Sequence, residues 1–430
     1  MLESLFKLRE NKTSAGTEIL AGLTTFLTMA YIIFVNPDIL SKAGMPRDAV
    51  FAATCIAAAV GCALMAFVAN YPIALAPGMG LNAYFAFSVV LGMKISWQVA
   101  LGCVFISGVL FLILSLLPVR AWIVDAIPKS LKMAIAAGIG LFLALIALQS
   151  AKIVVPHPAT MVTAGDLKSW PVILAVLGFV LIVALDHRKV PGAVIIGVLA
   201  VTAASALVGA SKFGGVFAMP PSVAPVFLQM DLAGALNVGL VTVIFAFLFV
   251  DLFDNSGTLV ALAHRAGFLT AKGMVPRLGK ALVADSSAAM LGAAIGTSTT
   301  TSYIESASGI AAGGRTGLTA LTVGVLFVLA LFLAPLAASV PPWATAPALL
   351  YVACLMMRSL LEIDWDDITE VAPAMVTALA MPFTFSIAEG IAFGFIAYAS
   401  IKLVAGRWSD IHPAVAILAV LFVAKFAFVS

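Results

Sequence analysis

Three carboxylates lie in stretches of sequence that are otherwise apolar enough to cross a membrane. Asp251 and Asp254 belong to VGLVTVIFAFLFVDLFDNSGTLVALA, and Glu305 lies in GTSTTTSYIESASGI, between two further apolar segments. A charge at the centre of a bilayer costs at least about 2.5 kcal/mol, so such residues usually serve a function. Asp251 and Asp254 are three residues apart and share one face of a helix. This pattern predicts a polar site inside the membrane.

The pairing of Asp251 with Asp254 indicates proton chemistry. In surroundings of low dielectric constant, two carboxylates on one face repel each other when both are ionised. One of them is therefore expected to take up and release a proton near neutral pH, which proton-coupled transport requires. The alternative is a structural pair that is hydrogen-bonded to a neighbouring helix. For Glu305 the structural alternative is a capping box with Ser302, three residues earlier.

The composition is typical of a polytopic, all-α membrane protein. Of the 430 residues, 63% are hydrophobic and only 10% are charged, whereas a soluble domain has about 25% charged residues. A soluble core could not hold this much apolar sequence. The sequence has no GxSxG, HExxH, P-loop or complete GxGxxG motif. We therefore expect no enzymatic activity, no cofactor, no metal site and no nucleic-acid partner.

Fourteen apolar segments are expected to cross the membrane, the first of them near 18–40. A further apolar stretch at 413–428 is either an interfacial helix or an additional one. Lys and Arg are more frequent in alternate connections, as at Arg188, Lys189 and Arg315. By the positive-inside rule, this asymmetry predicts a cytoplasmic N-terminus.

The chain shows a weak internal repeat. GLTTFLTMAYIIFV (22–35) is similar to GLVTVIFAFLFVDL (239–252), and each is followed after fifty to sixty residues by a broken apolar segment. The broken segments are YPIALAPGMGLNAYF (71–85) and GTSTTTSYIESASGI (296–310). Seven spans per half would give the two halves opposite topology, and such paired breaks often mark a transporter's binding site. The alternative is chance similarity between apolar segments.

Each broken segment is expected to combine extended backbone with a short half-helix. Pro77, Gly78 and Gly80 disfavour a continuous helix, so Asn82 would lie in the first turn of a half-helix. The alternative role for Asn82 is a cap or an interhelical hydrogen bond. In the second segment, the hydroxyl run 297–302 favours extended backbone. A helix from about Tyr303 would then place Glu305 in its first turn, where the helix dipole favours a negative charge.

These motifs resemble the signatures of the AzgA-like purine permeases, a branch of the nucleobase–cation symporters. The matching stretches are LTTFLTMAYIIFVNP, APGMGLNAYF, FVDLFDNSGTL and GTSTTTSYIESASGIAAGGRTGLTAL. The resemblance implies fourteen spans in two inverted seven-span repeats, with short strands in spans 3 and 10. It divides the chain into a cytoplasmic N-terminus (1–17), a core domain (18–117 and 235–338), a gate domain (118–210 and 343–405) and a C-terminal segment (406–430).

The resemblance also assigns roles to residues. It implies that Asn82, Asp251 and Glu305 contact the purine and that Asp254 is the proton-linked residue. Gly80 would let the backbone of span 3 approach the purine closely. The hydroxyls of Thr28, Thr300 and Ser302 complete the candidate substrate-binding set, although a helical threonine such as Thr28 often bonds only to the preceding turn.

The implied activity is proton-coupled import of hypoxanthine, guanine or adenine across the cytoplasmic membrane by an elevator-like movement. Na⁺ is the alternative coupling ion. The implied partners are the purine, membrane lipid and a second copy bound through the gate domain. The alternative function is transport of an anion, sulfate or bicarbonate, by the same fold. Three acids in the site would repel an anion, which disfavours that alternative.

Overall fold

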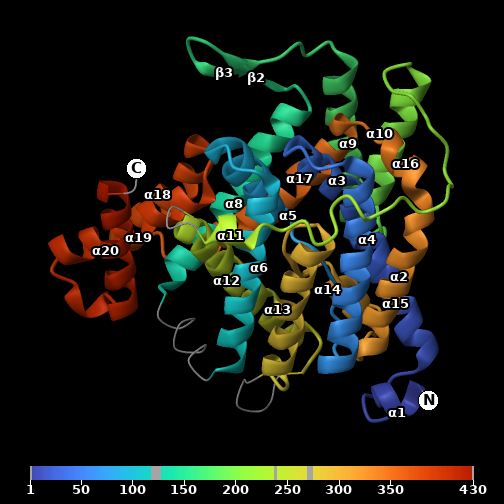
Figure 1. Ribbon diagram of the computed structural model, residues 1–430, viewed down its shortest axis with the longest axis horizontal. Helices are drawn as coiled ribbons and strands as arrows, with labels where there is room; N and C mark the ends of the chain where they lie inside the picture. The colour runs from blue at the N-terminus through green and yellow to red at the C-terminus, as the bar shows by residue number, and fades with distance from the viewer. Residues whose placement is uncertain (1, 118–126, 237–239, 269–274, 429–430) are drawn as a thin grey trace.

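The computed structural model describes residues 2–117, 127–236, 240–268 and 275–428, and most of this chain is helical (Figure 1). In the first half the helices are α1 Leu2–Phe6, α2 Ala15–Met29, α3 Ile32–Lys42, α4 Arg47–Leu64, α5 Met79–Ala83, α6 Trp97–Leu116, α8 Lys129–Ser150, α9 Trp170–His187 and α10 Ala193–Leu207, with π-helical turns at Met65–Ala69 and Tyr84–Gly92. In the second half they are α11 Leu232–Ala235, α12 Val241–Arg265, α13 Leu278–Ile295, α14 Ser306–Ala311, α15 Gly317–Ala330, α16 Ala334–Ser339, α17 Pro342–Met357, α18 Ile368–Thr384, α19 Ile387–Val404 and α20 Pro413–Phe428.

The protein is a multi-pass membrane protein. Within the described ranges, ten helical stretches are long and apolar enough to cross a bilayer, and four shorter apolar helices accompany them. The count of fourteen spans and the inverted repeat stay predictions. The predicted start of the gate domain, at residue 118, lies outside the described residues. The predicted first span, 18–40, is broken at Ala30 and Tyr31, between α2 and α3.

The two broken segments pair with each other through short strands. β1 (Leu75–Pro77) and β4 (Thr300–Ser302) are antiparallel, with Ala76 opposite Thr301, and each is followed by a half-helix. Their backbone groups are bonded inside the protein: the amide of Tyr303, for example, donates to the carbonyl of Ala74 at 3.0 Å. Non-helical backbone at membrane depth is tolerated when protein satisfies it in this way. The extended backbone that was predicted for the two broken segments is thus confirmed.

One sheet was not expected from the sequence. Strands β2 (Val154–His157) and β3 (Met161–Ala164) form an antiparallel hairpin between α8 and α9. The hairpin projects at one end of the helical bundle, and α1 lies at the opposite end (Figure 1). These ends are called the hairpin end and the N-terminal end below. Apart from Val154 and Val155, the residues of this hairpin are exposed, so it has little of the buried alternation that would identify strands in a sequence.

The helices pack in two groups. Helices α8, α9, α10, α17, α18 and α19 contact one another extensively. Helices α2, α4, α6, α13 and α15 form the other group, and α14 packs on α2. Gly138 of α8 shows how closely the first group packs, because a Cβ there would lie 3.0 Å from the Cα of Ala378 in α18. The paired strands lie beside α4, α12 and α13, so the second group positions the predicted site.

A buried lysine holds the last turn of α19 against α18. The Lys402 side chain is fully buried, with its ammonium 2.6 Å from Glu370 and 3.5 Å from Asp410. Arg407 adds ion pairs of 2.5 Å to Asp367 and 2.9 Å to Asp410. Hydrogen bonds from Thr369 and Arg407 lower the pKa of Asp367 to about 2. Because its pKa in the folded protein is depressed, ionised Asp367 stabilises the fold at any pH above the ordinary pKa of 3.8. This contribution is lost only as the pH falls towards 2, so Asp367 stays charged at moderately acidic pH.

Replacing Lys402 by methionine is expected to lower the free energy of unfolding by roughly 3 kcal/mol, because Glu370 then lacks its buried partner, whereas Asp410 keeps its ion pair with Arg407. Thermal unfolding of the purified protein measures the change. The matched control is Lys129→Met, which breaks an ion pair with Glu362 whose two side chains are 66% and 58% exposed. An exposed pair contributes about 0–1 kcal/mol. If the two variants lowered the Tm equally, the ion pairs of Lys402 would contribute no more stability than an exposed pair, which would contradict the prediction.

Candidate functional site

Asp251 lies at the centre of a hydrogen-bond network that joins α12 to the segment around β4. Its Oδ1 accepts from the amide of Asn255 at 2.8 Å, and its Oδ2 accepts from the hydroxyl of Thr299 at 3.1 Å. Asn255 in turn accepts from the Thr301 hydroxyl and, at 3.1 Å, from the Ser302 backbone amide. Asp251 is only 2% exposed. The network therefore fixes the strand relative to α12 and occupies both oxygens of the carboxyl group.

Asp254 and Glu305 are the more accessible acids. Asp254 is exposed, and Glu305 is partly exposed at the residue that precedes α14. The two carboxyl groups are close enough to interact electrostatically. The prediction that α14 begins near Tyr303 was three residues too early. The capping-box alternative for Glu305 is wrong, because Glu305 itself occupies the N-cap position and the Ser302 hydroxyl donates to Asp285 instead.

Asp285 is a further member of the site, which the sequence motifs did not indicate. It is fully buried in the middle of α13, and its Oδ1 accepts from the Ser302 hydroxyl at 2.6 Å. Its Oδ2 has no hydrogen-bond partner in the part of the chain that the structure describes. Asp285 interacts electrostatically with Asp251 and Asp254. An acid inside the apolar segment 276–294 was the available signal, by the same cost of burial that identified Asp251.

Asn82 lies in the first half-helix, α5, as expected, and is fully buried. Its amide donates to Asn36 Oδ1 at 2.6 Å, and its carbonyl oxygen accepts from the Ser298 hydroxyl. Asn36 itself donates to Thr54 at 2.7 Å and to Thr297 at 2.9 Å. This amide–hydroxyl network ties α3, α4 and α5 to the segment before β4. Contact between Asn82 and a substrate stays a prediction, and here its amide bonds to protein.

The other predicted site residues lie around these networks. A Cβ at Gly80 would lie 2.6 Å from Cγ2 of Ile139, so Gly80 allows α5 to approach α8 closely. Thr300 is fully buried, and its hydroxyl has no partner among the described residues. Thr28 is half-buried on α2, and its hydroxyl lies 3.0 Å from that of Ser308 in α14. The structure therefore places Thr28 beside the second broken segment, to which Thr300 belongs.

On the face of α12 that carries Asp254, residues are exposed towards one end of the helix and buried towards the other. From Asp254 onwards, exposed residues recur at helical spacing, at Gly257, Ala261 and His264. On the same side of the helix but nearer α11, Phe247 and Val250 are only 1% and 3% exposed. Residues three to four apart lie on one face of a helix. The exposed face of α12 therefore extends from Asp254 to the end at which Arg265 lies.

Near the hairpin end, polar contacts join α3, which packs on α4 of one helix group, to α8 and α17 of the other. Lys42 of α3 donates to Ser150 at the end of α8 at 3.0 Å and forms a 3.5 Å ion pair with Asp38. Asp38 is 5% exposed and accepts from Thr345 of α17 at 3.4 Å. The groups are thus closed against each other here, on the side where α12 is buried.

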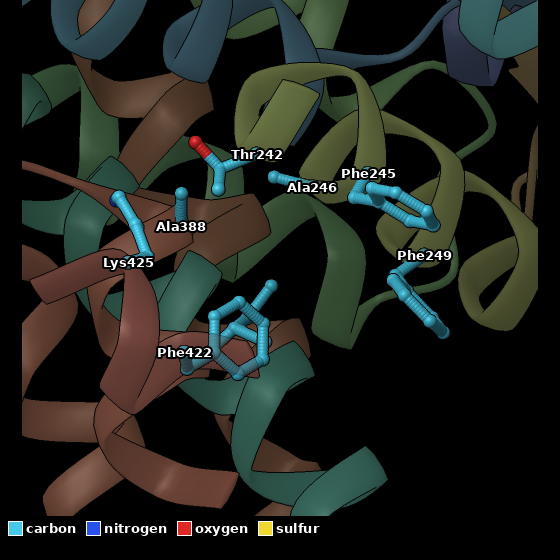
Figure 2. Close-up of a pocket in the computed structure, with 8 residues that line it drawn as sticks. Thr242, Phe245, Ala246, Phe249, Ala388, Phe422 and Lys425 are labelled. Atoms are coloured by element: carbon cyan, nitrogen blue, oxygen red, sulfur yellow. The ribbon is translucent and has the colours of Figure 1, made fainter. Parts of the chain in front are cut away.

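A hollow between α12, α19 and α20 lies apart from this acidic site. Figure 2 shows its lining, which is apolar except for a threonine and a lysine and includes no carboxylate: Thr242, Phe245, Ala246, Phe249, Ala388, Ile391, Phe422 and Lys425. Such a surface offers little to orient the polar edge of a small substrate. The acidic networks around β1 and β4 are the better candidate for the functional site.

Comparison with known proteins identifies the class. Residues 16–393 match the sequence profile of the Permease family that is labelled Xan_ur_permease. The chain belongs to this family, and it is therefore a membrane transporter and not an enzyme.

Curated relatives cover the whole chain. Adenine permease AdeP of Escherichia coli is 49% identical over 430 residues, which are 100% of this chain and 97% of the relative. Guanine/hypoxanthine permease PbuG of Bacillus subtilis is 46% identical over 441 residues, with full coverage of both chains. These matches confirm the resemblance to purine permeases that the motifs indicated.

A solved structure shows the fold. The transmembrane domain of the cyanobacterial bicarbonate transporter BicA superposes with a TM-score of 0.63 over 94% of this chain and 97% of that domain, at 16% sequence identity. At such low identity the likeness concerns the fold alone. Families that share one fold often carry different substrates, so the site decides the function.

Proposed function

We propose that this protein imports purine nucleobases, namely adenine, hypoxanthine or guanine, across the cytoplasmic membrane. The observation that carries the proposal is the full-length similarity, at 46–49% identity, to an adenine permease and a guanine/hypoxanthine permease. The chemistry of the site supports it. A purine is flat and uncharged near neutral pH, and its edges present N–H donors and ring-nitrogen acceptors, which carboxylate and amide side chains can bind.

In the proposed site, Glu305 and Asp251 accept N–H groups of the purine, and Asn82 offers both a donor and an acceptor. Gly80, Thr28, Thr300 and Ser302 shape the surroundings. Glu305 is reachable in the described conformation, whereas both oxygens of Asp251 are bonded to Asn255 and Thr299. A purine that binds Asp251 must therefore share an oxygen with the Asn255 amide or the Thr299 hydroxyl, or displace one of them. Asp254 is proposed to carry the coupling proton, with Na⁺ as the alternative coupling ion.

The proposed transport cycle moves a core domain (18–117 and 235–338) against a gate domain (118–210 and 343–405). The two packing groups of helices support this division. Phe268, three residues beyond α12, stacks on Tyr71, and the neighbouring Asn70 donates to Phe6 of α1, so the Arg265 end of α12 lies at the N-terminal end. With the N-terminus in the cytoplasm, the exposed face of α12 opens inwards, and the contacts of Asp38 and Lys42 close the outer side. An alternating-access carrier must break these contacts in its other state.

A cross-link tests whether the contacts at the hairpin end break during transport. In a variant with Asp38→Cys and Thr345→Cys, a short thiol cross-linker is expected to reduce uptake at least about tenfold, because alternating access requires both states. Uptake is compared before and after treatment. Each single substitution, treated in the same way, is the control for reaction of the linker with native cysteines such as the exposed Cys354. Full uptake by a protein shown to be cross-linked would contradict the movement at this position.

Uptake of labelled purine in a carrier-deficient strain tests the proposed function. Expression of this chain is expected to confer saturable uptake of hypoxanthine or adenine, and competition by each unlabelled nucleobase ranks the purines. Collapse of the proton gradient is expected to abolish accumulation, whereas removal of Na⁺ should leave it intact. Sulfate or bicarbonate uptake that purines do not inhibit would favour the anion transporter instead.

A further inference from the structure

Tyr31 holds one oxygen of the accessible acid Glu305. It lies at the break between α2 and α3 and is 1% exposed. Its phenol donates to Oε1 of Glu305 at 2.5 Å. The other oxygen, Oε2, accepts no hydrogen bond from any other described residue, and Glu305 is partly exposed. One oxygen is thus bonded to protein, while the other is available to a ligand.

Helix α2 also fixes the backbone that carries Glu305. The Thr28 hydroxyl lies 3.0 Å from that of Ser308, which in turn donates to the Glu305 carbonyl at 2.7 Å. A Cβ at Gly309 would lie 2.6 Å from the carbonyl oxygen of Ala21, so α14 rests directly on α2. The position of Glu305 is therefore set by several contacts. Among the described residues, Tyr31 supplies the one side-chain hydrogen bond to the Glu305 carboxyl group, which the backbone amide of Glu305 itself also approaches.

Buried Glu18 anchors the far side of the same unit. Its two carboxylate oxygens accept from the backbone amides of Arg315 and Thr316, at 2.9 and 3.1 Å, just before α15 begins. Free amides at a helix N-terminus favour a negative group. Helix α2 is thus bound both to α14 and to the start of α15. Loss of the Tyr31 hydroxyl leaves these contacts in place, so its effect should be confined to the carboxylate.

We propose that Tyr31 is a positioning residue for substrate recognition, which orients the Glu305 carboxylate so that Oε2 meets an N–H group of the ligand. The inference rests on the proposed function, since it concerns the purine contact assigned to Glu305. A hydrogen bond to a charged acceptor changes affinity by about tenfold to a hundredfold. Removal of a residue that acts on binding alone raises KM and leaves the maximal rate unchanged.

Transport kinetics of Tyr31→Phe test the proposal. The variant removes only the hydroxyl oxygen, and KM for the preferred purine is expected to rise about tenfold, while the maximal rate per folded protein changes by less than about twofold. The matched control is Tyr84→Phe, because the Tyr84 hydroxyl is buried without a partner in the described part of the chain. The control is expected to keep the wild-type KM.

A second readout separates positioning from a general structural role. If Tyr31 acts through Glu305, the losses of affinity for adenine, hypoxanthine and guanine in Tyr31→Phe should follow the same rank order as in Glu305→Gln. Unchanged KM, a different rank order or a lower maximal rate at constant KM would overturn the proposal. If the variant accumulates poorly, the purine-induced rise in Tm of the purified protein measures affinity instead, and an unchanged rise overturns it. Wild-type protein without purine uptake would refute the proposed function itself.

Discussion

Asp251→Ala is expected to abolish measurable purine uptake, with a loss of at least about 30-fold. Removal of a buried charged group from its hydrogen-bond partners costs about 2–5 kcal/mol of binding free energy. Each 1.4 kcal/mol changes the affinity tenfold. Asp251 accepts hydrogen bonds from Asn255 and Thr299, so the change also leaves two buried donors without their acceptor. Initial rates of labelled purine uptake, normalised to folded protein, measure the loss.

Two further variants separate a site effect from misfolding. Asp251→Asn keeps the shape of the side chain and one acceptor, and it is expected to fold with a near-normal Tm while still losing uptake. Asp364→Asn alters an exposed acid in the connection before α18 and should leave uptake unchanged. Wild-type uptake by Asp251→Asn would remove Asp251 from the proposed binding set.

Asp254→Asn is expected to separate binding from accumulation. The side chain is exposed and lies one turn from Asp251, so an amide fits without repacking. The variant should bind and exchange purine with a KM within about threefold of wild type. The accumulation ratio should fall to about one, because an amide cannot take up and release the coupling proton. Steady-state accumulation under an imposed pH gradient, together with exchange of labelled purine, measures both properties.

The opposite pattern would reverse the roles of the two aspartates. Asp254 shares the accessible region with Glu305, whereas Asp251 is enclosed by Thr299 and Asn255. If Asp254→Asn lost binding and Asp251→Asn kept exchange without accumulation, the buried residue would be the proton carrier. Equal loss of both properties in both variants would contradict any division between binding and coupling.

The sequence was most informative where burial of polar groups is costly. The acids in apolar segments and the two broken segments correctly indicated where α12, β1 and β4 meet, because a charge or irregular backbone in a membrane needs partners. The pairing of Ala76 with Thr301 and the extended backbone on both sides agree with the predicted strands. The spacing of Asp251 and Asp254 correctly placed both on one helix.

Other features depend on three-dimensional contacts that no sequence pattern reveals. The partners of Asn82 are Asn36 and Ser298, which are 46 and 216 residues away in the chain. The sequence does not connect Asp285 of α13 with the site, because the Ser302 hydroxyl that donates to it lies in the second broken segment. The accessible face of α12 likewise depends on which helices cover it, so hydropathy along the helix could not predict it.

Counterflow in liposomes tests the central claim most directly. Purified protein is reconstituted into vesicles loaded with unlabelled adenine, hypoxanthine or guanine and diluted into a trace of the same labelled purine. A purine permease is expected to accumulate label transiently above equilibrium, with no added energy source, and Asp364→Asn should do the same. No counterflow with any purine, together with counterflow of labelled sulfate or bicarbonate, would contradict the proposed function.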